Sequence, residues 1–229
     1  MAQVALVTGA NRGLGLEVSK QLAELGYTVI LTARDAEKGN EAAKSIASSG
    51  DVHAVQMDVT DNDSILTARD WVQEKFGQLD VLVNNAAILY DTWQRASTAD
   101  LQQVQQAFDT NTLGAWRIAQ AFMPMLRKSE HGRLVNVSSE AGSLASMGSG
   151  TPAYNISKVA LNALTIMLAQ ELRSDGVLVN AICPGWTATD MGGGGRPIPE
   201  GAKSIVWAVT LPDDGETGGF FRDGKQLNW

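Results

Sequence analysis

Short runs of Val, Leu, Ile and Ala recur along the chain, and most of them are followed by a segment with helical periodicity. The runs that resemble strands are residues 4–7, 27–33, 52–57, 79–83, 133–137 and 177–182, with a short seventh near 219–221. Strands that are apolar throughout are buried on both faces, and strands separated by helices pair in parallel. Because such crossovers are right-handed, the pattern predicts an α/β, doubly wound (Rossmann) domain. Its seven-stranded, mostly parallel sheet would have helices on both faces.

Composition narrows the class of protein. The 229 residues suit one large domain and no stretch resembles a linker, so residues 1–229 are expected to form a single domain. The net charge of −7 argues against nucleic acid or an anionic membrane surface as a partner. We find no signal peptide and no apolar run near the ~20 residues of a membrane span, and expect a cytoplasmic location. One Cys and two His supply no familiar set of metal ligands, so no metal site is predicted.

Ligands of this fold bind outside the carboxyl ends of the strands, and the chain has suitable residues there. Gly9, Gly13 and Gly15 lie between the first strand and the first helix. They permit a tight turn and a close approach of a pyrophosphate to the N-terminus of the helix. Asp58, at the end of the third strand, could accept a hydrogen bond from an adenine amino group. Alternatively, Asp58 belongs to the cap of the helix that begins near Asp61.

The segment 138–158 contains a candidate catalytic group. If Pro152 opens a helix, Tyr154 and Lys158 share one face of it. Lowering a phenol pKa from about 10 to near 7 takes about 4 kcal/mol, roughly what a unit charge at about 4 Å supplies at an effective dielectric near 20. Such a Tyr can act as a general acid toward a carbonyl oxygen. Ser139, at the end of the preceding strand, could hold that oxygen.

Several motifs occur together and in order. They are TGANRGLG at 8–15, DV at 58–59, NNAA at 84–87, Asn111, NVSS at 136–139, YNISK at 154–158 and PGWTATDM at 184–191. Over essentially its whole length the chain resembles the short-chain dehydrogenase/reductase family, and most of all its carbonyl-reductase branch. The resemblance implies that Tyr154 is the acid/base and that Lys158 binds the nicotinamide ribose and lowers the Tyr154 pKa. It further implies that Ser139 orients the substrate carbonyl and that Asn111 holds a proton-relay water through a kinked helix.

The same resemblance implies a set of cofactor contacts. Thr187 and Thr189 would face the nicotinamide carboxamide, and Asn85 would lie in the cofactor ribose region. The residues expected to contact the cofactor are Gly9, Asn11, Arg12, Gly13, Leu14, Gly15, Arg34, Lys38, Asp58, Val59, Asn85, Ala86, Tyr154, Lys158, Pro184, Gly185, Thr187 and Thr189.

The residues after the second strand predict which dinucleotide is used. NAD enzymes of this fold usually place an acid there to bind the ribose 2′-hydroxyl, whereas this chain has Ala33 and then Arg34. Arg12 and Lys38 lie near the same ribose, so three cations could converge on a 2′-phosphate. Asp35 could repel that phosphate, but as a helix N-cap it should point toward the backbone. We therefore expect NADPH/NADP as the cofactor.

These observations together predict an NADPH-dependent carbonyl reductase that converts small ketones or aldehydes to alcohols. Trp186, Trp93, Met147 and Met191 are candidates for an apolar wall, which favours neutral, hydrophobic substrates. One alternative is a 3-oxoacyl-[acyl-carrier-protein] reductase, which needs a basic docking patch that this acidic chain does not display. Another is a non-catalytic dinucleotide-sensing protein, which would be expected to have lost part of the catalytic set.

Two apolar helices predict self-association. Residues 113–126 and the helix after Tyr154 are apolar on nearly every side, more than one sheet face can cover. The chain also lacks the long insertion between Ser139 and Tyr154 that monomeric vertebrate carbonyl reductases have. We expect a homodimer or homotetramer. The glycine run at 192–195 is either a mobile flap or a linker.

Overall fold

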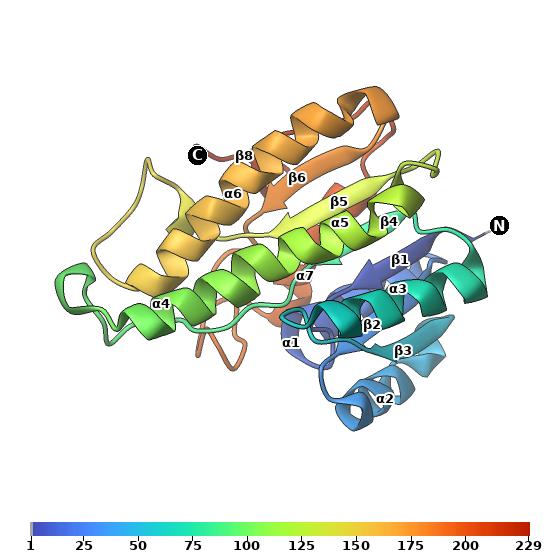
Figure 1. Ribbon diagram of the computed structural model, residues 1–229, viewed down its shortest axis with the longest axis horizontal. Coiled ribbons are helices and arrows are strands. Elements are labelled where there is room, and N and C mark those ends of the chain that lie inside the picture. The colour runs from blue at the N-terminus through green and yellow to red at the C-terminus, as the bar shows by residue number, and fades with distance from the viewer. Residues whose placement is uncertain (1) are drawn as a thin grey trace.

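The computed structural model describes residues 2–229, and all of its strands belong to one sheet (Figure 1). Their order across the sheet is β3-β2-β1-β4-β5-β6-β7-β8. The strands are β1 (Val4–Val7), β2 (Thr28–Ala33), β3 (Val52–Gln56), β4 (Val81–Asn84), β5 (Arg133–Val137), β6 (Leu178–Ile182), β7 (Phe220–Arg222) and β8 (Lys225–Gln226). The first seven run parallel and β8 pairs antiparallel with β7. The predicted doubly wound sheet is confirmed.

The eighth strand is the one addition to the seven predicted. It is two residues long, too short for an apolar pattern, and it follows a tight turn at Asp223 and Gly224. Both turn residues have positive φ, 52° and 72°. An Asp-Gly pair with this geometry is typical of a two-residue hairpin, so the pair in the sequence could have predicted this last strand.

Helices cover both faces of the sheet. They are α1 (Gly13–Glu24), α2 (Ala36–Ser45), α3 (Asn62–Phe76), α4 (Leu101–Phe108), α5 (Ala115–Leu126), α6 (Pro152–Leu172) and α7 (Ile198–Val209). Residues of α3, α5 and α6 pack with Leu6 and Leu82 in one core, and residues of α1, α2 and α7 pack with Val7 and Val83 in the other. Neighbouring strand residues thus enter opposite cores, which explains why the strands are apolar throughout.

The strand register brings the candidate site residues to one edge. Val7 pairs with Leu31 and Val83, and Val137 pairs with Ile182, so these strands end close to one another. The chain builds outward from β1 toward β3, and from β4 toward β8 on the other side. In sheets with this reversal, a ligand crevice lies at the carboxyl ends of the two central strands, here β1 and β4.

The helical region that contains Asn111 is interrupted. It begins at Leu101, and a π-helical segment, Asp109–Gly114, separates α4 from α5. At Gly114 a Cβ would lie 2.9 Å from a methyl carbon of Val59, so glycine lets the helix approach the end of β3. Single π-helical turns inside α-helices occur frequently at functional sites, and Asn111 lies in this one.

The longest helix, α6, has 21 residues and buries polar side chains such as Asn155, Ser157 and Lys158 among its apolar ones. Within residues 2–229, every helix is too short or too polar to span a bilayer.

Candidate active site

The turn between β1 and α1 is shaped to receive an anion. Gly9 and Gly13 have φ of 61° and 59°, and a Cβ at Gly9 would lie 2.8 Å from the Cα of Ala86. Arg12, the N-cap of α1, makes no side-chain cap hydrogen bond, and the first turn has no acidic residue. The N–H groups of that turn therefore stay available for a phosphate, with the helix dipole favouring negative charge. This arrangement fits the pyrophosphate of a dinucleotide.

Asn85 holds this turn from the end of β4. Its Nδ2 donates to the carbonyl oxygens of Thr8 and Gly9 at 2.8 and 3.2 Å. The main-chain N–H groups of Asn85 and Ala86 both donate to the Thr8 hydroxyl at 3.0 Å. The Asn85 amide hydrogens are thus used to brace the glycine turn, and its expected place in the cofactor ribose region stays a prediction.

The sequence left two roles open for Asp58, adenine binding and capping of the next helix, and in the structure Asp61 is the residue that caps the helix. Asp61 is the N-cap of α3 and accepts from the N–H groups of Asp63 and Ser64. Asp58 closes the preceding turn through Oδ1, which accepts from the N–H and hydroxyl of Thr60 at 2.9 and 2.8 Å. Its Oδ2 accepts no hydrogen bond from residues 2–229, so it remains suited to an adenine amino group.

The three cations expected around a 2′-phosphate have different surroundings. Arg12 is paired with Asp190 at 2.7 Å, and Lys38 lies 3.6 Å from Asp35. Asp35 is the N-cap of α2 and accepts from the Lys38 N–H at 3.1 Å, as expected. The exposed guanidinium of Arg34 has no ion pair within residues 2–229. Arg34 is therefore the cation most available to an anionic ligand.

The catalytic candidates converge where β5 ends beneath the first turns of α6. Pro152 opens α6 as expected, and Lys158 Nζ lies 5.5 Å from the centre of the Tyr154 ring. That Nζ donates to the carbonyl oxygen of Val137 at 2.8 Å. The Ser139 hydroxyl lies close enough to the Tyr154 phenol to lower its pKa, whereas Ser138 points away and donates to Asn162 at 2.6 Å.

Burial reverses one sequence-based expectation. Burial raises the pKa of Tyr154, the nearby Cys183 raises it further, and the neighbouring Ser139 hydroxyl offsets only part of the rise. Burial also lowers the pKa of Lys158 to about 8. The expectation that Lys158 brings the Tyr154 pKa near 7 is wrong for this arrangement, because desolvation disfavours both charged forms. The phenol therefore holds its proton at neutral pH, as a proton donor must.

Asn111 links three segments around Tyr154. Its Oδ1 accepts from the N–H of Ile88 at 2.8 Å, and its Nδ2 donates to the Ile88 carbonyl and to Ser157 at 3.1 and 3.0 Å. Ser157 in turn donates to the Tyr154 carbonyl at 2.7 Å. Both amide hydrogens of Asn111 are used within the protein, so a water relay would depend on its second Oδ1 lone pair or on the main chain of the π-helical segment.

The segment after β6 forms a closed loop. Arg196 N donates to the Trp186 carbonyl at 2.9 Å, and the indole N–H of Trp186 donates to the Gly192 carbonyl at 2.9 Å. Two hydrogen bonds of 2.9 Å join the Arg196 guanidinium to Asp223. The glycine run at 192–195 therefore belongs to a hydrogen-bonded loop.

The four cofactor candidates of this segment are placed differently. Pro184 and Gly185 lie just beyond β6, after Cys183, and the buried Thr187 hydroxyl donates to the Gly185 carbonyl at 3.0 Å. Thr189 faces the glycine turn, since a Cβ on Gly13 would lie 3.7 Å from its methyl group. Thr189 thus lies beside the glycine turn, and the expected contacts of Thr187 and Thr189 with the nicotinamide stay predictions.

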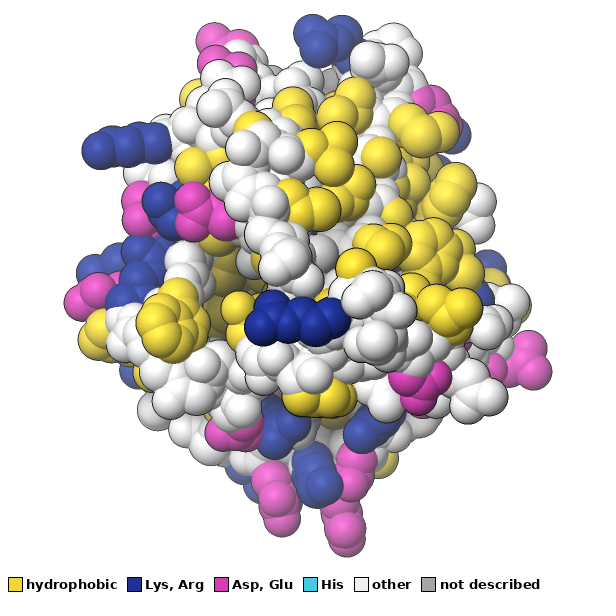
Figure 2. Space-filling view, turned by 90° about the vertical axis from the view of Figure 1, so that its left-hand side faces the viewer, with side chains coloured by type: hydrophobic (Ala, Val, Ile, Leu, Met, Phe, Trp, Pro, Cys, Tyr) yellow, Lys and Arg dark blue, Asp and Glu magenta, His cyan; other side chains and the backbone are white. Residues whose placement is uncertain are grey.

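A hollow of about 450 Å³ opens beside this loop, at the edge where the strands end. Its lining residues are Tyr90, Thr92, Trp186, Asp190, Met191, Gly192 and Gly193. Figure 2 views this side of the molecule and shows hydrophobic side chains gathered over part of it. Trp93 and Met147 are also exposed but do not line the hollow, so their contact with substrate stays a prediction.

Two residues at this edge were not singled out from the sequence. The Tyr90 ring meets the Tyr154 ring edge to face, with centroids 5.2 Å apart. Asp91 is fully buried and accepts hydrogen bonds from the first turn of α6. Both lie in the loop that follows NNAA and β4, and this position at a strand's carboxyl end was a signal that could have identified them.

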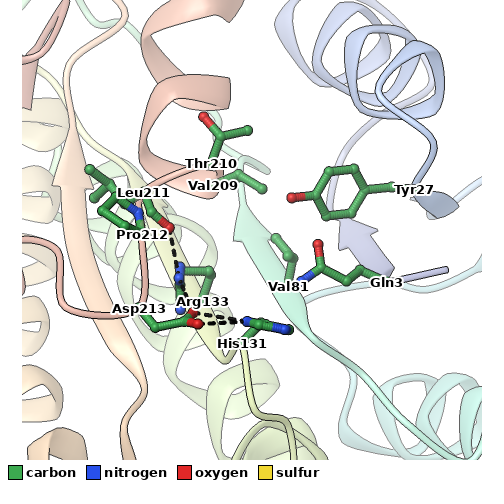
Figure 3. Close-up of a pocket in the computed structure, with 10 residues that line it drawn as sticks. All are labelled: Gln3, Tyr27, Val81, His131, Arg133, Val209, Thr210, Leu211, Pro212 and Asp213. Carbon is green, nitrogen blue, oxygen red and sulfur yellow. Dashed lines mark hydrogen bonds and ion pairs between the residues drawn. The ribbon is translucent and has the colours of Figure 1, made fainter. Parts of the chain in front are cut away.

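A second cavity, of about 320 Å³, lies at the opposite edge of the sheet, where β4 and β5 begin (Figure 3). Its charged groups pair with one another. Asp213 accepts from Arg133 at 2.7 Å and lies 2.9 Å from His131 Nδ1. These contacts tie the segment after α7 to the start of β5, far from Tyr154.

Within the described chain, no three His, Cys, Asp or Glu side chains are grouped as a metal site would require. Cys183 is buried after β6, and burial raises the pKa of its thiol. A buried thiol of this kind is unreactive.

Comparison with known proteins gives a consistent result. Residues 3–197 match the family model of short chain dehydrogenases. The carbonyl reductase [NADPH] 1 of Sus scrofa is 32% identical and aligns with 99% of this chain and 94% of its own length. The (+)-neomenthol dehydrogenase of Arabidopsis thaliana is 31% identical, with 98% and 97% covered. The NADPH-bound carbonyl reductase from chicken fatty liver has a TM-score of 0.90 at 30% identity, covering 100% of this chain and 99% of that one. The chain therefore belongs to the short-chain dehydrogenase family of oxidoreductases, with relatives in its carbonyl-reductase branch.

Proposed function

We propose that this protein is an NADPH-dependent carbonyl reductase that converts ketones or aldehydes to alcohols. The observation that carries the proposal is the grouping of Ser139, Tyr154 and Lys158 at the end of β5, near the crevice beside the glycine turn. The names of relatives support it, since the pig protein is a carbonyl reductase for NADPH and the chicken structure holds NADPH.

Three residues of this chain bind the carbonyl oxygen, donate the proton and stabilise the charge that remains. NADPH supplies a hydride to the carbonyl carbon when it is bound. The Ser139 hydroxyl holds the carbonyl oxygen, and the adjacent Tyr154 phenol gives its proton to that oxygen as negative charge develops there. The raised pKa of Tyr154 keeps the phenol protonated before reaction. Lys158 places positive charge beside the ring, where it stabilises the phenolate that remains.

The cofactor contacts follow from the same geometry. The free N–H groups at the start of α1 suit the pyrophosphate, Asp58 Oδ2 suits the adenine amino group, and Arg34 suits a 2′-phosphate. The position at the end of β2 that holds an acid in NAD enzymes is occupied by Ala33, which favours NADPH over NADH.

The lining of the 450 Å³ hollow supports a neutral, hydrophobic substrate such as an aryl ketone. Tyr90, Trp186 and Met191 supply apolar surface, and no Lys or Arg of residues 2–229 lines it. This composition disfavours the acyl-carrier-protein alternative, because a phosphate-bearing acyl carrier calls for positive charge. A cytoplasmic location and a homodimer or homotetramer remain predictions.

A turnover assay tests the proposal. NADPH consumption is followed with a panel of aryl ketones, aldehydes, quinones and a 3-oxoacyl thioester. Tyr154→Phe should lower kcat by about 10²–10⁴-fold, because it removes the transferable proton. Tyr27→Phe, at the opposite edge of the sheet, is the matched control and should keep full activity.

Three results would overturn the proposal. If Tyr154→Phe retains more than half of the wild-type turnover, the general acid is misassigned. If thioesters are reduced far more efficiently than aryl ketones, the acyl-carrier-protein alternative replaces it. A wild-type protein that binds NADPH and reduces nothing would support the dinucleotide-sensing alternative.

A further inference from the structure

A buried carboxylate from another part of the chain caps the helix that holds Tyr154. Asp91 has none of its surface exposed. Its Oδ1 accepts from the N–H of Tyr154 at 3.1 Å, and its Oδ2 accepts from the N–H of Ala153 at 3.0 Å. Gln94 Nε2 adds a third donor at 3.1 Å. The carboxylate is thus surrounded by N–H groups.

The start of α6 needs this distant cap because it has no local one. Thr151 stands at the N-cap position with φ of 50° and makes no side-chain cap hydrogen bond. Its hydroxyl donates to Asn155 Oδ1 at 2.7 Å, and Pro152 has no N–H to offer. The N–H groups of Ala153 and Tyr154 have no acceptor within the helix, since the first turn never does.

The electrostatics explain why a charged residue is tolerated there. No Lys, Arg or His within residues 2–229 forms an ion pair with Asp91, although a buried charge is costly without compensation. Charge-assisted bonds from N–H groups, together with the positive end of the α6 dipole, supply that compensation. A neutral side chain of the same shape would lack this attraction.

We propose that Asp91 is a positioning residue for the Tyr154 phenol. The Asp91 bond is made at the N–H of Tyr154 itself, so it fixes the backbone from which the phenol projects. Tyr90, the preceding residue, packs against the Tyr154 ring. One loop after β4 therefore holds both the main chain and the ring of the proton donor.

This inference rests on the proposed function, and it predicts a specific kinetic defect. A proton donor displaced by about 1 Å slows reaction by about 10²-fold, whereas the hydrogen bonds that Asp91 makes within residues 2–229 join it to Gln94 and to the first turn of α6, and not to the glycine turn or α2. Asp91→Asn keeps one acceptor oxygen but turns an NH₂ group toward the second N–H. We expect kcat to fall about 10-fold in Asp91→Asn and about 100-fold in Asp91→Ala, with the Kd for NADPH changed less than about two-fold.

The experiment separates positioning from loss of fold. Rates are expressed per NADPH-binding site, measured by fluorescence titration, so that unfolded molecules do not count. Asp61→Asn is the matched control, because Asp61 caps α3 through the N–H groups of Asp63 and Ser64. It should lower the melting temperature without changing kcat per site. Hydrogen exchange at residues 153–154 should speed up in the Asp91 variants and not in Asp61→Asn.

The values of kcat per site and the exchange rates at residues 153–154 either support or contradict the role of Asp91. A reduced kcat per site with faster exchange at 153–154 supports the inference. If wild type reduces ketones and the Asp91 variants keep more than half of kcat per site, the inference is wrong while the proposed function stands. The inference is also wrong if total activity falls only in proportion to the number of NADPH-binding sites, because kcat per site is then unchanged. If wild type reduces no carbonyl, the proposed function fails and the kinetic part of the inference fails with it.

Discussion

The ammonium group of Lys158 donates to the main-chain carbonyl of Val137, with 2.8 Å between the two atoms. Val137 is the last residue of β5, and Ser139 follows two positions later. The bond therefore joins α6, which carries Tyr154, to the end of β5, which leads to Ser139, and so fixes the position of one relative to the other. It is made by a side chain that is 2% exposed, and this burial lowers the pKa of Lys158 to about 8.

The lowered pKa of Lys158 predicts how stability depends on pH. The folded protein loses the Lys158 proton near pH 8, whereas the unfolded chain keeps it to about 10.5. Between these values the unfolded state holds the Lys158 proton more firmly, so the Lys158 contribution to the free energy of unfolding should rise with pH, by at most about 3 kcal/mol. Burial raises the pKa of Cys183, which contributes in the opposite direction, so denaturant unfolding between about pH 8 and about pH 10 is compared between wild type and variants. Lys158→Met should give a less positive slope than wild type, and the exposed-site control Lys203→Met should keep the wild-type slope; equal slopes in both would contradict the assignment.

Arg34 should determine the preference for NADPH. Arg34→Ala removes a cation that no residue within 2–229 pairs with. A charge-assisted contact of about 1.5–3 kcal/mol corresponds to roughly a 10- to 150-fold loss in kcat/KM for NADPH, with little change for NADH. Steady-state kinetics with both cofactors at one pH provides the measurement. Lys44→Ala, at the far end of α2, serves as the control, and an equal loss for both cofactors would show that Arg34 does not contact the 2′-phosphate.

Releasing Arg12 should strengthen cofactor binding slightly. Arg12 lies in the glycine turn and is held by Asp190 from the loop after β6, at 2.7 Å. Both side chains are largely exposed, and such pairs are worth about 0.2–1 kcal/mol. Asp190→Asn should therefore lower the Kd for NADPH by roughly 1.5- to 5-fold, more at low salt, because a competing anion is removed. Titration of NADPH fluorescence measures this Kd, with Asp214→Asn as the control. Unchanged or weaker binding in Asp190→Asn would mean that Arg12 does not contribute to NADPH binding.

Exposed apolar side chains on α5 and α6 should mediate self-association. Trp116 and Met167 are 37% and 60% exposed on the helical layer formed by α3, α5 and α6. We expect a dimer or tetramer by light scattering at micromolar concentration, because water-exposed apolar surface of this kind favours contact with another copy. Met167→Glu should shift the mass toward the monomer. Leu25→Glu, beside α1 on the other face, should leave it unchanged, and a monomeric wild type would refute the prediction.

Features that depend on neighbours in the sequence were predictable from it. Seven apolar runs separated by helices identify a parallel sheet, since only burial on both faces accommodates such strands. Pro152 at the start of α6, with Tyr154 and Lys158 four residues apart, follows from helix geometry alone. Asp35 as the N-cap of α2 likewise needs only the next three residues.

The tertiary structure decided what depends on residues distant in the chain. The π-helical segment at 109–114 coincides with the close approach of Gly114 to Val59. The direction of the Tyr154 pKa follows from burial, which spacing along a helix does not reveal. The bonds from Asp91 to α6 and from Asp190 to Arg12 join segments separated by 62 and 178 positions. Desolvation and long-range hydrogen bonds are properties of the packed molecule, because each requires partners that only folding brings within reach.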